Sequence, residues 1–281
     1  MSVREMERLR LRPGVGLRLE DPFGGPLGEG LQASIVLADS GLPPVSLLPT
    51  PSGYWTAQGL PGLRAWEAGE GDDPALLARL FEVAVNDPRG RVLPSRFRVR
   101  LPQNRLAHLA CPGVAPGDPP IEHFPIPLFA APARSVPAGW ACVRASVREL
   151  PVADPDKAPA AAWALVDVFQ GATRLATGLA DARGEALLAF PYPEPPDAGA
   201  GTRSAFDVTW PLTLSLRYRR QSAASIPLLC DLLAQPAKPV ARSAAGEPPV
   251  VVMGADLSIS LRYGQPLAVA TPGARALFVQ P

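Results

Sequence analysis

The sequence contains few of the residues that build metal centres and reactive thiol sites. Its 281 residues include three cysteines and two histidines. Cys111, Cys142 and Cys230 are odd in number and their spacing fits no zinc or redox motif, so we expect buried or idle thiols in a reducing compartment. His108 and His123 lie fifteen residues apart without a pattern of carboxylates, and they make a poor metal ligand set. The sequence therefore predicts no metal, no cofactor and no catalytic histidine.

Long apolar runs and an excess of one charge are also missing. No segment approaches the eighteen or more apolar residues of a membrane-spanning helix. Residues 1–20 lack the apolar core of a secretory signal peptide. The 27 basic and 26 acidic residues leave a net charge of +1, which favours neither a nucleic acid nor a membrane surface as a partner. We therefore expect a cytoplasmic protein without a membrane span.

Motifs of the common enzyme classes are absent as well. The sequence has no Gly-x-Ser-x-Gly elbow, no His-Glu-x-x-His motif and no phosphate-binding loop. Asp154 and Asp156 suggest calcium at first sight, but a calcium site needs several more oxygen ligands, and a plain loop fits better. Asp72 and Asp73 are better explained by a helix over 72–80, for which Asp73 is a good N-cap. We expect a protein that is not an enzyme.

Proline and glycine, in contrast, are abundant: the chain has 36 and 25 of them, scattered without a period. Proline breaks helices and central strands, so we expect many short strands joined by turns. Alternating segments such as Phe97–Leu101 indicate strands with one buried and one wet face. These patterns predict an all-β protein with two sandwich modules. The expected divisions are an N-terminal arm at 1–13, a first β-sandwich at 14–102, a Pro-rich connector at 103–137, a second β-sandwich at 138–233, and a linker with a C-terminal strand tail at 234–281.

The clearest local signal lies in Trp163–Pro191. This stretch divides into three short strands, at 163–169, 174–180 and 185–190. Asp181–Gly184 reads as a turn between the second and third strands, in which Gly184 is free to adopt positive φ. We expect this turn to set the register of the second sandwich.

This order of elements, with Thr-Gly on the second strand and an Asp-x-x-Gly turn before the third, resembles the carboxypeptidase regulatory-like domain. The matching residues are Val166, Val168, Thr177, Asp181, Gly184, Leu187 and Phe190. The resemblance implies tandem Ig-like or transthyretin-like β-sandwich modules with Pro-rich connectors. Tyr54 and the Leu-Pro-Gly turn at 60–62 are similar to the same modules, and by that similarity Leu63–Ala68 would be the next core strand. Regulatory-like modules without a signal sequence resemble accessory proteins encoded with contractile phage-tail-like injection particles.

We therefore expect a non-enzymatic structural or accessory component of such a particle, assembled in the cytoplasm. Its partners would be sheath, tube, baseplate or cap proteins, with homo-oligomerisation inside the assembly left open. Apolar groups in the connector and the tail should pack on a domain or a partner, because large side chains left in water forfeit burial. Deleting 246–281 should then leave both sandwiches folded. The expected partner-binding residues are Phe124, Ile126, Leu128, Phe129, Arg217, Arg219, Arg220, Val251, Ile259 and Tyr263.

Two questions stay open at this point. The tail is too short for a domain of its own, so its strands must join a sheet in this chain or in a neighbour. The alternative function is a free-standing binding module for carbohydrate or a protein ligand. Such a module would need an exposed aromatic platform. Tyr54, Trp55 and Trp66 could supply one, although we expect at least two of them to pack in the core.

Overall fold

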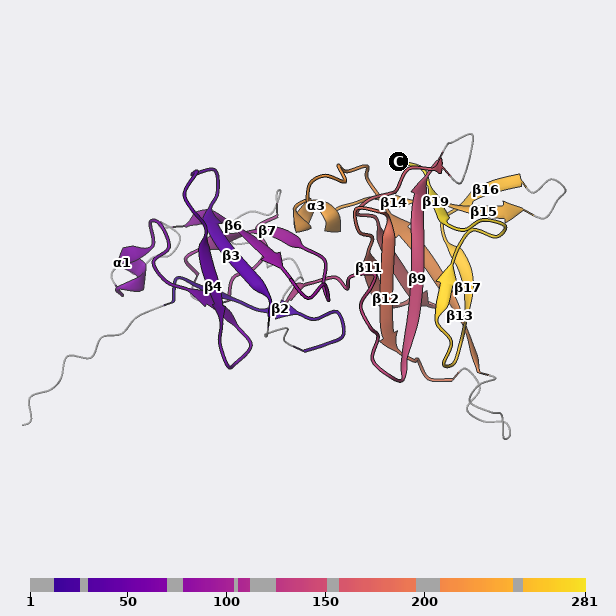
Figure 1. Ribbon diagram of the computed structural model, residues 1–281, viewed down its shortest axis with the longest axis horizontal. Coiled ribbons are helices and arrows are strands. Elements are labelled where there is room, and N and C mark those ends of the chain that lie inside the picture. The colour runs from indigo at the N-terminus through magenta and orange to yellow at the C-terminus, as the bar shows by residue number, and fades with distance from the viewer. Residues whose placement is uncertain are drawn as a thin grey trace, which may run out of the picture. The chain divides into compact units, whose positions relative to one another are not determined.

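A computed structural model describes residues 13–25, 30–69, 78–103, 106–111, 125–150, 157–195, 208–244 and 250–281. Strands make up 46% of the structure and helices 5%, in several mainly antiparallel sheets, which confirms the predicted all-β class. The chain forms two compact units (Figure 1). The first unit comprises Met1–Glu20, Gly24–Pro88 and Arg96–Pro127, and the second comprises Asp21–Phe23, Arg89–Ser95 and Leu128–Pro281.

The first unit is built on a six-stranded sheet. Its strand order is β1 (Val15–Leu17), β5 (Trp55–Ala57), β4 (Val45–Pro49), β3 (Gln32–Leu37), β6 (Arg79–Asn86) and β7 (Ser95–Leu101). Alternate residues of these strands are buried, and Ile35, Phe81 and Phe97 are fully excluded from solvent. A short parallel pair, β2 (Leu19–Glu20) with β8 (Ile126–Pro127), adds to this unit.

One predicted strand of the first unit is wrong, because Leu63–Ala68 contains the helical turn α1 (Arg64–Glu67). Leu63 and Trp66 are three residues apart and both buried, which is the spacing of one helix face and not of a strand. The Glu67 carboxylate accepts hydrogen bonds from the amides of residues 59 and 60, at 2.9 and 3.3 Å, and so ties the helix to the preceding turn. The helix predicted over 72–80 lies mostly outside the described residues.

The second unit is a sandwich of two sheets. One sheet has the order β11 (Thr173–Leu179), β10 (Leu165–Gln170), β13 (Thr209–Arg217) and β14 (Ala237–Lys238), and β17 (Leu257–Arg262) also pairs with β13. The other has the order β12 (Glu185–Pro191), β9 (Trp140–Glu149), β19 (Leu277–Val279), β15 (Val240–Ala244) and β16 (Val250–Gly254), and β18 (Leu267–Val269) pairs with β9. Buried side chains from both sheets form one core between them.

The C-terminal tail completes both sheets of its own chain, which answers the first open question. β17 pairs with β13 over six residues of each strand. β18 and β19 pair in parallel with successive parts of β9, along the edge that β12 leaves free. Leu261, Leu277 and Val279 are fully buried in the core. The structure therefore reverses the outcome that we predict for deleting 246–281, since that deletion removes strands from both sheets of the sandwich.

The turn at Asp181–Gly184 forms as predicted, but it crosses from one sheet to the other. β11 and β12 flank it and belong to different sheets. The Asp181 carboxylate accepts the amide hydrogens of Arg183 and Glu185 at 2.8 and 3.0 Å, which holds the turn closed. Gly184 has a φ of +80°, a conformation that glycine adopts without strain. Its carbonyl accepts the Val147 amide at 2.7 Å, so the turn is bonded directly to β9.

The cysteines differ from the expectation of three free thiols. Cys111 and Cys230 form a disulfide bond. Cys142 is free and buried on β9. The spacing of the cysteines along the chain could not reveal this bond, because pairing depends on which residues the fold brings together.

Candidate binding pocket in the second unit

The second unit carries an open pocket of about 400 Å³. Three segments line it: residues 136–144, Tyr192, and the loop from Tyr263 to Pro266 that joins β17 to β18. The volume is within the range of small-molecule sites, roughly 300–1,000 Å³. The side chains that matter most for the argument are Trp140, Cys142, Arg144, Tyr192 and Tyr263.

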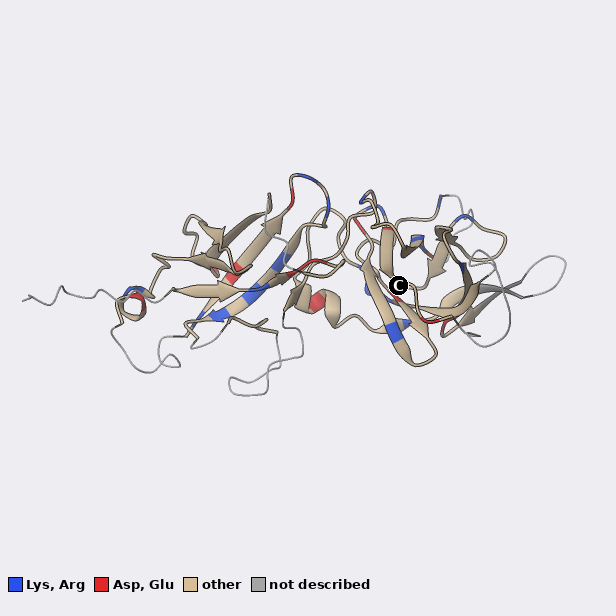
Figure 2. Cartoon of the chain, turned by 90° about the horizontal axis from the view of Figure 1, so that it is seen from below, with Lys and Arg blue, Asp and Glu red and all other residues tan. Residues whose placement is uncertain are grey.

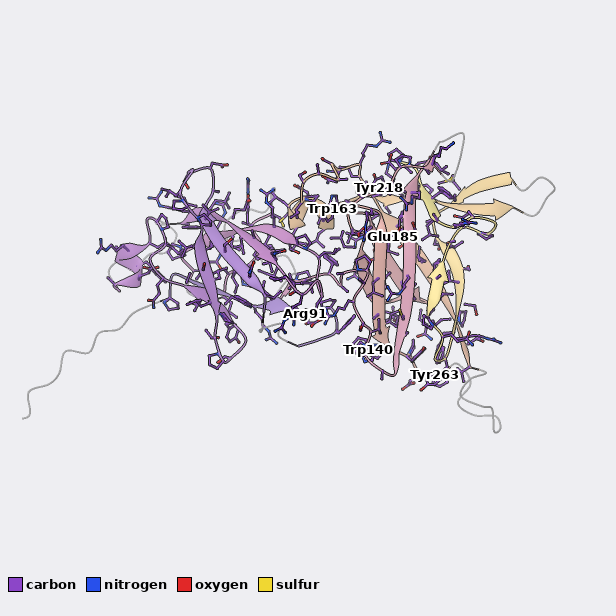
Figure 3. All side chains as sticks on the ribbon, in the orientation of Figure 1. Arg91, Trp140, Trp163, Glu185, Tyr218 and Tyr263 are labelled. Carbon is purple, nitrogen blue, oxygen red and sulfur yellow. The ribbon has the colours of Figure 1, made fainter. Side chains whose placement is uncertain are left out.

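Strand β9 presents its first residues to this pocket. Successive side chains of a strand point to opposite faces, and Ala141 and Val143 are fully buried in the sandwich core. Trp140, Cys142 and Arg144 therefore lie on the outer face of the sheet. Trp140 is half-buried and Arg144 is exposed, so both can meet a ligand. Figure 3 shows Trp140 at the lower end of β9 and Tyr263 at the same end of the unit.

Two tyrosines of the pocket rest on a buried tryptophan. Tyr192 and Tyr263 have ring centroids 4.8 Å apart, and both pack against Trp210, at 5.1 and 6.4 Å. Trp210 is 2% exposed and donates its indole N–H to the Glu194 carbonyl at 3.1 Å. The Tyr192 hydroxyl accepts the amide hydrogen of residue 264 at 2.9 Å. These contacts hold both tyrosine rings in place without a ligand. The rings therefore lose little conformational entropy when a ligand binds.

Trp140 is supported by a segment from far earlier in the chain. Its ring packs against Phe23 with centroids 5.7 Å apart. The Arg134 guanidinium lies over the Phe23 ring, 3.9 Å from its centroid, and pairs with Asp21 at 2.7 Å. A cation over an aromatic face is attracted to it, and the ion pair orients that cation. One side of the Trp140 indole is thus packed against Phe23, and Arg134 and Asp21 hold Phe23 in place.

The pocket lining carries one positive charge and no carboxylate. Arg144 is the charged residue of the lining, and its guanidinium donates to the Pro132 carbonyl. Charged residues of both signs are distributed over the strands and loops of the unit (Figure 2). Glu185, two residues along β12 from the cross-strand partner of Arg144, accepts hydrogen bonds from Ser146 and Arg148 at 2.9 and 3.2 Å. The Glu185 carboxylate therefore has other partners.

The structure places the predicted partner-binding residues of the connector inside the protein. Ile126 pairs on β8 and is fully buried. Leu128 and Phe129 are 2% and 4% exposed, and the Phe129 carbonyl accepts the Leu93 amide at 2.8 Å. Phe124 lies outside the described residues. A Pro-rich apolar segment can thus bury its side chains against its own chain, as the sequence expectation allowed.

The predicted basic cluster takes part in intramolecular bonds. Arg217 donates to Asp167, a buried carboxylate that also accepts the Thr177 hydroxyl at 2.5 Å. Arg219 is exposed, and its amide donates to the Gln235 side chain at 2.9 Å. The bonds to Asp167 connect β10, β11 and β13.

Arg220, the third residue of the basic cluster, is itself exposed but bonds to the buried Glu149 at the far end of β9 from the pocket. Glu149, the last residue of β9, accepts hydrogen bonds from Tyr218 and Arg220 (Figure 3 labels Tyr218). Burial opposes ionisation of Glu149, but the hydrogen bonds and the charge of Arg220 outweigh it and lower its pKa. Burial and the neighbouring Glu149 carboxylate raise the pKa of Tyr218. The group of Glu149, Tyr218 and Arg220 joins the end of β9 to the segment that follows β13 and so braces the sandwich.

The remaining predicted residues lie in the tail. Val251 is on β16, where its backbone pairs with Ser243. Ile259 is on β17 and packs partly against the core. Of the predicted residues whose side chains the structure describes, Tyr263 alone lines the pocket. The structure therefore does not gather the predicted residues into one surface.

Sequence reasoning missed most of the pocket. Trp140 is the first residue of β9 and follows a glycine, and Tyr192 directly follows β12 and stands between two prolines. The signal that could have found them is an aromatic residue beside a turn residue at three separate strand ends. The aromatic residues that were considered, Trp55 and Trp66, are 2% and 4% exposed, as expected for core side chains.

The part of the chain that the structure describes contains neither a cluster of metal ligands nor a membrane-spanning helix. There, no group of three or more His, Cys, Asp or Glu side chains could hold a metal ion. Asp72, Asp73, Asp154, Asp156 and His123 lie outside the described residues, and His108 is half-buried. No helix within the described ranges is long and apolar enough to cross a membrane. Comparisons of the chain with protein-family profiles, curated proteins and solved structures return no match.

Proposed function

We propose that the protein is a non-enzymatic binding protein whose second unit holds a ligand in the pocket lined by Trp140, Tyr192 and Tyr263. This proposal is supported by the packing of each aromatic ring of the pocket against another aromatic side chain of the unit. Trp210 lies beneath the tyrosines, and Phe23 stacks against Trp140. Aromatic rings that are ordered before binding present a large contact area at a small entropic cost, which is the property of a good binding platform.

This proposal is tested by titrating the purified chain with a panel of mono- and disaccharides and short peptides. Trp140 lines the pocket, so its fluorescence should report binding. Trp140→Ala should weaken binding of any ligand found by more than tenfold, while Tyr54→Ala, which removes a half-buried ring from the first unit, should not. Thermal melting of both variants checks that each still folds. Binding that survives the loss of Trp140 contradicts the assignment of the pocket.

A second candidate is a structural or accessory subunit of a contractile phage-tail-like injection particle, assembled in the cytoplasm with sheath, tube, baseplate or cap proteins. The resemblance of residues 163–191 to regulatory-like modules supports it. So do two exposed apolar side chains of the first unit, Leu42 at 44% and Leu48 at 64% exposure. The Cys111–Cys230 disulfide weighs against a reducing compartment.

The second candidate is tested by isolating contractile particles from the native host and asking whether this chain is a stoichiometric component. Leu48→Arg should then reduce incorporation, because it places a charge at the exposed apolar position of β4. Ser46→Arg is the matched control, since Ser46 is also exposed on β4 but offers no apolar contact. Absence of the chain from intact particles removes this candidate and leaves the pocket proposal untouched.

A further inference from the structure

The charge of the pocket narrows the class of ligand. Arg144 is its charged lining residue, and no carboxylate pairs with Arg144 among the described residues. The nearby carboxylates Glu185 and Asp21 pair instead with Arg148 and Arg134. An exposed cation without a counter-ion, beside a surface of aromatic rings, attracts an anionic group on the ligand.

The guanidinium of Arg144 is held in one direction and still has N–H donors that can bind a ligand. One of its nitrogens donates to the Pro132 carbonyl, which fixes its direction. A guanidinium has five N–H donors in a planar fork, so most of them stay available to a ligand. That fork matches the two oxygens of a carboxylate and can bind them through parallel hydrogen bonds. The Tyr192 hydroxyl accepts the amide of residue 264 and retains its own O–H for donation.

The aromatic part of the lining calls for a ligand with a flat apolar face. The faces of Trp140, Tyr192 and Tyr263 carry negative electrostatic potential and attract weakly positive C–H groups. A pyranose ring has such a C–H face on one side and hydroxyl groups around its rim. A sugar that carries a carboxylate combines all three features, namely a face for the rings, hydroxyls for Tyr192 and an anion for Arg144.

We infer that the pocket recognises an acidic saccharide of the uronic acid type, with the carboxylate on Arg144 and the sugar ring on the aromatic side chains. This inference rests on the proposed binding function and specifies its ligand. Methyl glucuronide and methyl glucoside are suitable probes, because they differ only in carrying a carboxylate or a hydroxymethyl group at C5.

The test compares the two sugars by nuclear magnetic resonance titration of the full chain with its disulfide intact. Methyl glucuronide should bind about ten- to a hundredfold more tightly, the range for a charge-assisted hydrogen bond. Arg144→Gln should abolish this preference, so that the two sugars bind with similar, weak affinity, and Arg144→Lys should restore part of it. Arg148→Gln is the matched control, since Arg148 is on the same face of β9 but pairs with Glu185 outside the pocket.

Each other outcome overturns a defined part of the reasoning. Equal affinity for both sugars refutes the acidic preference and leaves the binding function in place. Binding of an acetylated aromatic dipeptide through its terminal carboxylate, with neither sugar bound, refutes the saccharide and identifies a peptide site. Binding of none of these probes or of the wider panel refutes the pocket function itself. A glucuronide preference that persists in Arg144→Gln shows that the anion lies elsewhere.

Discussion

Replacing Gly184 by alanine tests the turn between the two sheets of the second unit. The φ of +80° is strained for any residue with a Cβ, at a cost of about 1–2 kcal/mol. A Cβ at this position would also lie less than 3.0 Å from the Val147 carbonyl oxygen of β9. Either the turn or the strand must then move.

A shift of the turn or of β9 would weaken two backbone hydrogen bonds. The Val147 amide donates to the Gly184 carbonyl at 2.7 Å, and the Ala161 amide donates to the Val147 carbonyl at 3.0 Å. Each such bond contributes about 0.5–1.5 kcal/mol. We therefore expect Gly184→Ala to lower the free energy of unfolding of the second unit by about 2–5 kcal/mol, a large part of a typical stability of about 5–15 kcal/mol.

Substitutions at two other glycines distinguish the cost of backbone strain from the cost of the close contact. Gly171, in the β10–β11 hairpin, has a φ of +56° but nothing within 4 Å of an added Cβ, so Gly171→Ala should lose only the strain. Gly178 has no such φ, but its Cβ would lie 2.7 Å from Leu188 and 2.9 Å from the Leu187 carbonyl, where β11 approaches β12. Gly178→Ala should therefore lose only packing.

Urea unfolding followed by hydrogen exchange of β9 peptides is the measurement for all three variants, because β9 pairs with several strands of the unit. Equal losses for Gly184→Ala and Gly171→Ala would refute the contact with Val147 and leave backbone strain as the whole effect.

Two further predictions concern the tail and the buried acid. Deleting 246–281 should expose the β9 amides to exchange, because the six large apolar side chains that the tail buries contribute about 1.5–3 kcal/mol each, which together is as large as the whole net stability of a typical domain; retained protection of β9 would contradict this. The lowered pKa of Glu149 means that its ionised form stabilises the fold above its ordinary value of 4.5, and that this stability is lost as the pH falls through the folded-state pKa. Glu149→Gln should therefore destabilise the protein most near pH 7 and progressively less below pH 4.5; a difference from wild type that stays constant between pH 7 and pH 3 would show that ionisation of Glu149 does not matter.

Local features of the fold could be predicted from the sequence because they depend on neighbouring residues. Alternating apolar residues place strands near β3, β7 and β9, since only that period puts one face of a strand in the core. The Asp181–Gly184 turn is predictable because its aspartate bonds to amides two and four residues away and its glycine takes positive φ. The strand expected at Leu63–Ala68 failed for a related reason, since apolar residues three apart fit a helix as well.

The pairing of strands was decided by the tertiary structure alone. Strands β11 and β12 follow each other in sequence yet belong to different sheets, because the turn between them crosses the core. The sequence allowed the apolar tail to pack on a partner. In the structure its strands pair instead with edges of β9 and β13, and its apolar side chains fill the core between the two sheets. No single segment of the sequence specifies which strands pair. Strand β9 and its partner β18, for example, are more than a hundred residues apart in the chain.

The sequence by itself thus determined the all-β class, the short strands and the turn at Gly184, because backbone conformation responds to residues a few positions away. Only the tertiary structure decided the candidate pocket. Trp140, Tyr192 and Tyr263 meet there from three distant parts of the chain, and Arg144 joins them because it shares a strand face with Trp140. Their proximity follows from strand pairing and from burial of the core beneath them, which are properties of the whole unit and not of any one segment.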